Sequence, residues 1–222
     1  MGRYSLQGQV KQGLVVGTLI AACTAAVLVA IYVVTRATGT HFSDLTRDAA
    51  ATLDGPWYTA ALSNATVVMT SAGAAIAIFS AGLLDGRARG SVKGFLIALG
   101  LLVGVIAMDD LFMLHETVLP ALGIRAILLF GVYALALLGI LWFWREAIFG
   151  SSDYVFLVLA GLALGISGVV DSVFTDEGLL DLPFSGELIE DPAKILGMVF
   201  MTFYLVVTAR QALLRRVDAT TN

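Results

Sequence analysis

Six long apolar runs alternate with short polar segments along the chain. The runs cover residues 14–35, 57–84, 94–116, 121–144, 154–174 and 192–213. As an α-helix rising about 1.5 Å per residue, each run can cross about 30 Å of hydrocarbon. Outer-membrane strands are only about 9–11 residues long and alternate. The pattern predicts an all-α polytopic membrane protein, a six-transmembrane-helix bundle forming a single domain over residues 1–222.

The composition leads to the same class. Of 222 residues, 59% are hydrophobic and 14% are charged, whereas an average soluble domain is about 45–50% apolar and about 25% charged. A soluble domain of this size could not bury so much apolar surface, so membrane lipid is the expected partner. The net charge of −4 argues against nucleic acid, whose phosphates require clustered Lys and Arg. The composition leaves open whether the protein forms a homo-oligomer or binds another protein in a membrane complex.

Cysteine and histidine are scarce. Cys23 is the single cysteine, and His41 and His115 are the two histidines. One cysteine excludes an internal disulfide and a CxxC metal or redox site within one chain. Two histidines leave little basis for a haem held by histidine pairs, so we expect no haem.

The placement of Lys and Arg predicts the orientation. With the N-terminus inside, the inside segments hold nine of the 13 basic residues: Arg3, Lys11, Arg87, Arg89, Lys93, Arg145, Arg210, Arg215 and Arg216. The outside segments hold Arg36, Arg47 and Arg125, with Lys194 at the outer margin. The fifth loop, 175–191, has six acids and no base, which also favours the outside. We therefore expect both termini in the cytoplasm.

Glycines recur at four-residue spacing in two runs. Gly100 and Gly104 lie in the third run, and Gly161 and Gly165 lie in the fifth. Small residues let helices approach closely in lipid, so these positions predict close packing. The alternative interpretation is the general richness of membrane helices in glycine and alanine.

Ionisable residues gather at the outer end of the third run, in the segment 109–116 (DDLFMLHE). Such groups inside a span are costly and often functional. At about 100° per residue, Asp109 and Glu116 lie within about 20° of each other, with Asp110 and His115 about 100° and 120° away on opposite sides. We expect Asp109 and Glu116 to point inward together. One of the other two joins them, or both do if the helix loosens before Pro120.

The sixth run opens with the segment 190–194 (EDPAK). Asp191 before Pro192 is typical of a helix start, with Asp as the N-cap and Pro at the first helical position. Glu190 would then be an acid that the helix dipole favours. Lys194 opposes that dipole.

Three ionisable groups on different runs fall at one depth. Asp109 lies about 21 Å above the inner end of its span, and Asp171, one turn after Ser167, lies about 25 Å above the inner end of its own. Lys194 enters from the outside within the first turn of its helix. Lys194 could pair with Glu190 at i,i+4 spacing, or neutralise Asp109 or Asp171. We expect one shared polar site near the outer face.

The residue types at this site suit a metal ion. Carboxylates with one or two imidazoles suit Zn, Mn or Fe, and carboxylates alone suit Mg or Ca. The candidate ligands are Asp109, Asp110, His115, Glu116 and Asp171; Glu190, Asp191 and Lys194 form a further polar group. A divalent metal here could activate water for hydrolysis. The first hypothesis is therefore a metal-dependent membrane enzyme of hydrolase type.

Two other functions stay open. Acids paired with a buried Lys can carry protons or cations, so a proton- or cation-coupled transporter is one alternative. Polar residues of the second run could line its path: Asn64, Thr66, Thr70, Ser71 and Ser80. The other alternative is a non-catalytic membrane subunit or sensor, in which the polar cluster stabilises the fold or binds a partner.

The DDLFMLHE segment, together with the later Glu-Asp-x-x-Lys segment, resembles segments of uncharacterised bacterial multi-pass membrane proteins. The resemblance covers those two motifs and the six-span layout. It implies a plasma-membrane location of the bacterial inner-membrane type and carries no activity with it.

Overall fold

The computed structural model describes scattered residues between 18 and 39 and the continuous segments 60–84, 91–174 and 187–221. Outside the description are the side chains of Glu116, Ala126, Ser151, 171–174, 187–188 and 218–221. The chain divides into two compact units, Met1–Thr59 and Ala60–Asn222. The described residues from 18 to 38 are helical, as the first apolar run predicts, and the candidate site lies in the second unit.

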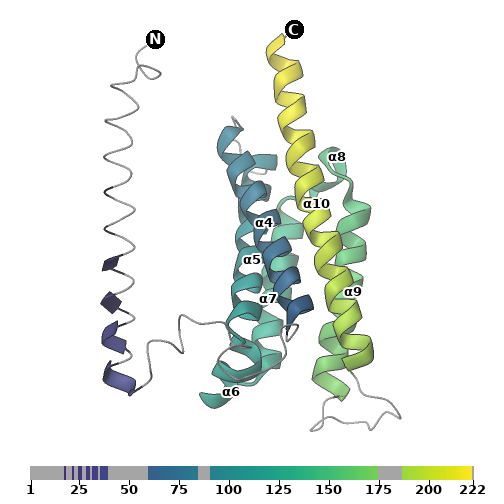
Figure 1. Ribbon diagram of the computed structural model, residues 1–222. Helices are drawn as coiled ribbons and strands as arrows, with labels where there is room; N and C mark the ends of the chain where they lie inside the picture. The colour runs from purple at the N-terminus through teal and green to yellow at the C-terminus, as the bar shows by residue number, and fades with distance from the viewer. Residues whose placement is uncertain are drawn as a thin grey trace. The chain divides into compact units, whose positions relative to one another are not determined.

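Within its described residues, the second unit consists of helices joined by short turns (Figure 1). Five longer helices form it: α4 (Ala61–Leu83), α5 (Val92–Leu111), α7 (Ala126–Phe143), α9 (Tyr154–Phe174) and α10 (Glu187–Thr221). Three short elements connect them: the π-helix η2 (Leu114–Val118), α6 (Leu119–Ala121) and α8 (Arg145–Ser151).

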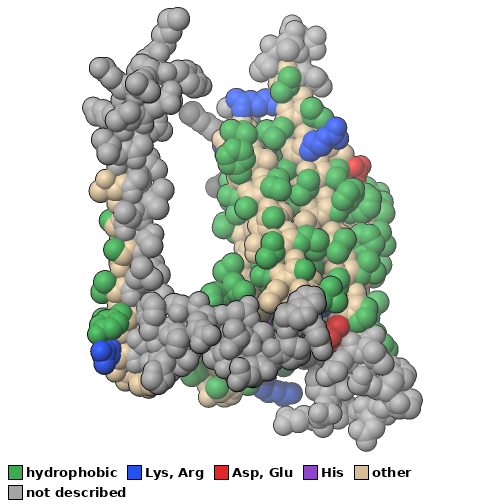
Figure 2. Space-filling view, in the orientation of Figure 1, with side chains coloured by type: hydrophobic (Ala, Val, Ile, Leu, Met, Phe, Trp, Pro, Cys, Tyr) green, Lys and Arg blue, Asp and Glu red, His purple; other side chains and the backbone are tan. Residues whose placement is uncertain are grey.

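Three described helical segments are long and apolar enough to cross a membrane: Ala61–Leu83, Val92–Leu111 and Ile189–Val217. The apolar segments of α7 and α9, Ile127–Phe143 and Tyr154–Val170, are shorter. The visible face of this unit is mostly hydrophobic, with charged side chains near its ends (Figure 2). The all-helical membrane class is thereby supported, whereas the count of six spans and the orientation stay predictions.

The start of α10 differs from the prediction. The helix begins at Glu187 and runs to Thr221, so Pro192 lies inside it. Asp191 as the N-cap and Pro192 as the first helical residue are therefore both wrong. Pro192 lacks the N–H that would bond the carbonyl of Leu188, and its ring crowds that carbonyl, so α10 has a weak point close to its N-terminal end.

The tightly packed core lies toward one end of the unit. α10 packs along α9 and α4, and α4 packs along α5. The core gathers where the chain passes from α4 to α5 and from α8 to α9, and its described residues are all apolar or aromatic. Phe95 and Tyr204 meet edge to face there, with ring centroids 6.1 Å apart. The Tyr204 hydroxyl lies 2.8 Å from Ser152 Oγ, which ties α10 to the end of α8.

The prediction of close packing at the spaced glycines is confirmed at Gly100 on α5 and wrong on α9. A Cβ added at Gly100 would lie 3.2 Å from the Ala74 carbonyl oxygen, and one at Gly104 would lie 3.8 Å from the Ala74 Cβ. Gly100 therefore sets the approach of α5 to α4, whereas a Cβ at Gly104 would make an ordinary van der Waals contact. At Gly161 and Gly165 an added Cβ would meet nothing within 4 Å, because these positions face open space.

Candidate functional site

A break in the helix shapes the outer end of the third apolar run. α5 ends at Leu111, and Met113 takes a left-handed backbone conformation with φ +49°. The chain then continues as η2 and α6, which contains Pro120. The expected helix through residue 116 is thus wrong, whereas the loosening before Pro120 is confirmed. The break lets His115 turn back toward α5.

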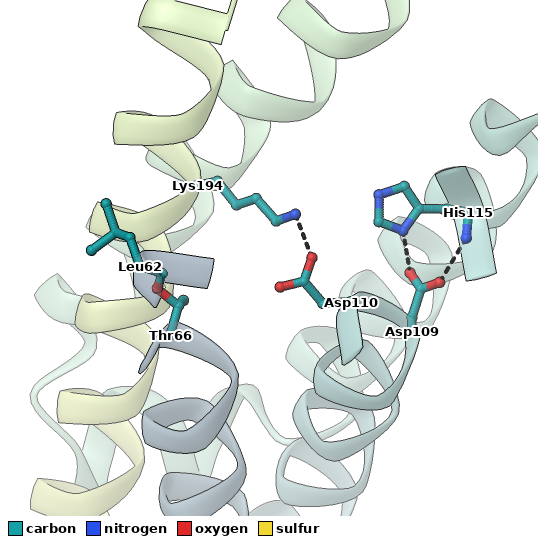
Figure 3. Close-up of polar contacts among 6 residues, drawn as sticks. All are labelled: Leu62, Thr66, Asp109, Asp110, His115 and Lys194. Atoms are coloured by element: carbon teal, nitrogen blue, oxygen red, sulfur yellow. Dashed lines mark hydrogen bonds and ion pairs between the residues drawn. The ribbon is translucent and has the colours of Figure 1, made fainter. Parts of the chain in front are cut away.

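Asp109 holds His115 through both of its carboxylate oxygens. The His115 backbone N–H donates to Asp109 Oδ1 at 3.0 Å, and His115 Nδ1 lies 2.9 Å from Asp109 Oδ2 (Figure 3). Both residues are buried, at 2% and 8% exposure. An ionised carboxylate only accepts hydrogen bonds, so this geometry suits a His115 ring with the proton on Nδ1, whose Nε2 is the acceptor nitrogen when the ring is neutral. The Phe130 ring packs on the imidazole with its centroid 5.1 Å away.

Asp110 forms an ion pair with Lys194 of α10 (Figure 3). The side chains are 7% and 21% exposed, respectively. Asp110 can face α10 because it lies about 100° round α5 from Asp109, which faces η2. The partners predicted for Lys194 from spacing and depth do not include Asp110.

The two pairs lie along one cavity of about 540 Å³, which is lined by residues of α5, η2, α7, α9 and α10. Its polar lining comprises Asp109, Asp110, His115, Tyr133, Ser167, Glu190 and Lys194, and the rest is apolar or glycine. The structure thus brings five of the predicted site residues to one cavity: Asp109, Asp110, His115, Glu190 and Lys194. Asp191 does not line this cavity and is exposed.

The metal prediction stays a prediction. Among the described residues, no group of three or more His, Cys, Asp or Glu is placed to hold a metal ion. Asp109 and His115 bind each other, and Asp110 binds Lys194. The predicted ligands Glu116 and Asp171 have side chains outside the described part, so the expected inward pairing of Asp109 with Glu116 is not tested.

Sequence reasoning missed the contribution of α7. Phe130, Gly131, Tyr133 and Ala134 line the cavity. The fourth apolar run is hydrophobic on every side, so no periodic pattern marks the face that looks inward. Tyr133 was the one residue that could have indicated the inward face of α7, because a hydroxyl inside an apolar run usually finds a polar partner.

The polar residues of the second run do not line this cavity. Thr66, Thr70 and Ser80 are buried on α4, and none of the five residues suggested for a transport path is part of the cavity wall. The Thr66 hydroxyl instead donates to the Leu62 carbonyl of its own helix at 2.9 Å (Figure 3).

These observations define an all-helical membrane protein with a buried polar cluster at one end of an apolar cavity. The chain belongs to the family described as Domain of unknown function (DUF8692), which matches residues 18–208. No curated protein and no solved structure matches the chain. The family has no known function, and the resemblance of the two motifs to segments of bacterial membrane proteins stays a prediction.

Proposed function

We propose that this protein is a membrane enzyme of hydrolase type in which His115 is the general base and Asp109 positions it. The single observation that supports the proposal is the buried Asp109–His115 pair at the wall of an apolar cavity. We place it in a six-span bundle with both termini in the cytoplasm, in a plasma membrane of bacterial inner-membrane type. The pair then lies near the extracytoplasmic face, where water is available.

The chemistry follows from the two nitrogens of the ring. Asp109 binds Nδ1, so proton exchange with a substrate falls to Nε2. Nε2 takes a proton from water as the water oxygen bonds to an acyl carbon. The bond from that carbon to the leaving oxygen or nitrogen then breaks, and the leaving atom receives the proton from Nε2. Asp109 stays ionised and stabilises the transient imidazolium.

The tautomer of His115 is the first prediction. We expect ¹⁵N NMR of a His41→Gln protein, in which His115 is the only histidine, to show a protonated Nδ1 and an unprotonated Nε2 in the neutral ring. In Asp109→Asn the carboxylate acceptor is lost, so the two tautomers should mix. A wild-type ring protonated at Nε2 would contradict the proposed role of Asp109.

Hydrolysis is tested with isotopically labelled water. The purified protein is incubated in H₂¹⁸O with vesicles that contain 1-monooleoylglycerol or N-oleoylethanolamine, and mass spectrometry follows ¹⁸O in the released oleic acid. We expect His115→Gln to lower the rate by about 10²–10⁴-fold, the usual contribution of a general base. His41→Gln, which replaces the other histidine, is the matched control and should retain the wild-type rate.

Two outcomes would favour the other hypotheses. Stoichiometric metal in the purified protein, lost in Asp109→Ala, would make the centre metal-dependent. Ion- or pH-dependent flux in liposomes, without release of labelled acid from either lipid, would replace the enzyme by a transporter.

A further inference from the structure

The cavity has the depth of one leaflet of a bilayer. On α5 its lining runs from Leu99 to Asp110, and on α7 it runs from Ile127 to Leu137. Ten residues of α-helix span about 15 Å, which is half of the roughly 30 Å hydrocarbon core. A single extended hydrocarbon chain therefore fits its length, with the chain's polar end at Asp109.

The cavity opens toward the side of the helices. Gly131 and Ala134 of α7, and Gly165 and Val169 of α9, line the cavity and are also exposed. An added Cβ at Gly131 or Gly165 would meet nothing within 4 Å. Glycines at these positions keep the space between α7 and α9 open, so a molecule can reach the cavity from the hydrocarbon layer.

The polar end carries more acids than bases. Among the described residues that line it, three carboxylates (Asp109, Asp110 and Glu190) face one ammonium, Lys194, and one imidazole, His115. A phosphate or a free carboxylate would add negative charge to this excess, at close range and in low dielectric. An uncharged head group with hydroxyls has donors for the carboxylates and carries no such cost.

We propose that the cavity binds a single-chain, uncharged amphiphile of the bilayer, with its hydroxyl-bearing head at the Asp109–His115 and Asp110–Lys194 pairs and its chain between α7 and α9. The inference names the substrate class of the site, and it rests on the proposed function for the bond that reacts. Binding itself depends only on the cavity.

Binding is tested with a probe that acyl hydrolysis does not cleave. A 1-O-alkylglycerol ether with a photoreactive diazirine in its chain is added to the protein in nanodiscs, and labelled peptides are mapped by mass spectrometry. We expect labelling of α7, α9 and α10, competed by 1-monooleoylglycerol. A fatty acid with the same photoreactive chain should label these helices several-fold less, because its head is anionic.

Matched glycine variants locate the binding. Gly165→Leu places a bulky side chain in the cavity and should lower labelling about tenfold or more. Gly139→Leu is the control, because Gly139 also has open space around its Cβ but does not line the cavity; its labelling should equal that of the wild type. Equal labelling in both variants, or preferential labelling by the fatty acid, would overturn the inference.

A photo-crosslinking benzoylphenylalanine at position 134 tests whether a segment of the protein itself, rather than a lipid, occupies the cavity. If it cross-links to residues 14–35 of the same chain without any probe, the first apolar run fills the cavity and the inference is wrong. The two proposals can fail separately. If the probe labels the cavity but no labelled acid is released, only the proposed hydrolase function is wrong. If labelled acid is released but the probe does not label the cavity, only the proposed binding site is wrong.

Discussion

Lys194→Met is expected to destabilise the protein far more than Asp110→Asn. Without Lys194, the Asp110 carboxylate, only 7% exposed, loses the cation that compensates its burial. Removal of one partner of a buried ion pair costs about 3–5 kcal/mol. In Asp110→Asn the ammonium remains, and its longer, 21% exposed side chain can extend toward water.

The measurement is thermal unfolding of the purified protein in one detergent. The double variant Asp110→Leu/Lys194→Met is the control, since it replaces both charges by apolar groups and should recover much of the loss. If both single variants unfold at the wild-type temperature, the pair contributes as little as a solvated surface pair, and the polar cluster is not buried.

Gly197→Ala should separate α9 from α10. A Cβ at Gly197 would lie 2.6 Å from Leu164 Cγ and 3.0 Å from the Leu164 backbone nitrogen. The backbone nitrogen cannot turn away, so the helices must shift, and overpacking of this kind costs about 1–3 kcal/mol. Because α9 and α10 pack along each other over much of their length, we expect a clear fall in the unfolding temperature.

Gly161→Ala is the matched control on α9. Its added Cβ would meet nothing within 4 Å, and alanine favours a helix over glycine by about 0.5–1 kcal/mol. Its unfolding temperature should therefore equal or exceed that of the wild type. Equal unfolding temperatures for Gly197→Ala and the wild type would show that the two helices are not in close contact at Leu164.

The sequence predicted best those features that depend only on nearby residues, namely the helices and the depth of residues along them. Uninterrupted apolar runs predicted the helices, and for α9 the predicted range 154–174 agrees with the observed Tyr154–Phe174. The shared depth of Asp109 and Lys194 also predicted that they would border one space, because depth in a helix depends only on residue number.

Partners within the cluster could not be predicted in the same way. The wheel of an ideal helix separates Asp109 from His115 by about 120°, and only the left-handed Met113 brings them together. No sequence rule places a left-handed methionine, a residue that rarely takes this conformation. The prediction of close packing failed at the α9 glycines for a related reason, since equal spacing occurs at the tightly packed Gly100 and at the open Gly165.

Pro192 interrupts the hydrogen bonding of α10 between two residues of the cavity wall, Glu190 and Lys194. Without its N–H, the Leu188 carbonyl loses its usual partner within the helix, and helices commonly bend at such a point. Glu190 lies before this weak point, whereas Lys194 lies after it and is tied to Asp110. Glu190 and Lys194 both line the cavity, so a bend of α10 at Pro192 would change the distance between this carboxylate and this ammonium at the polar end of the cavity.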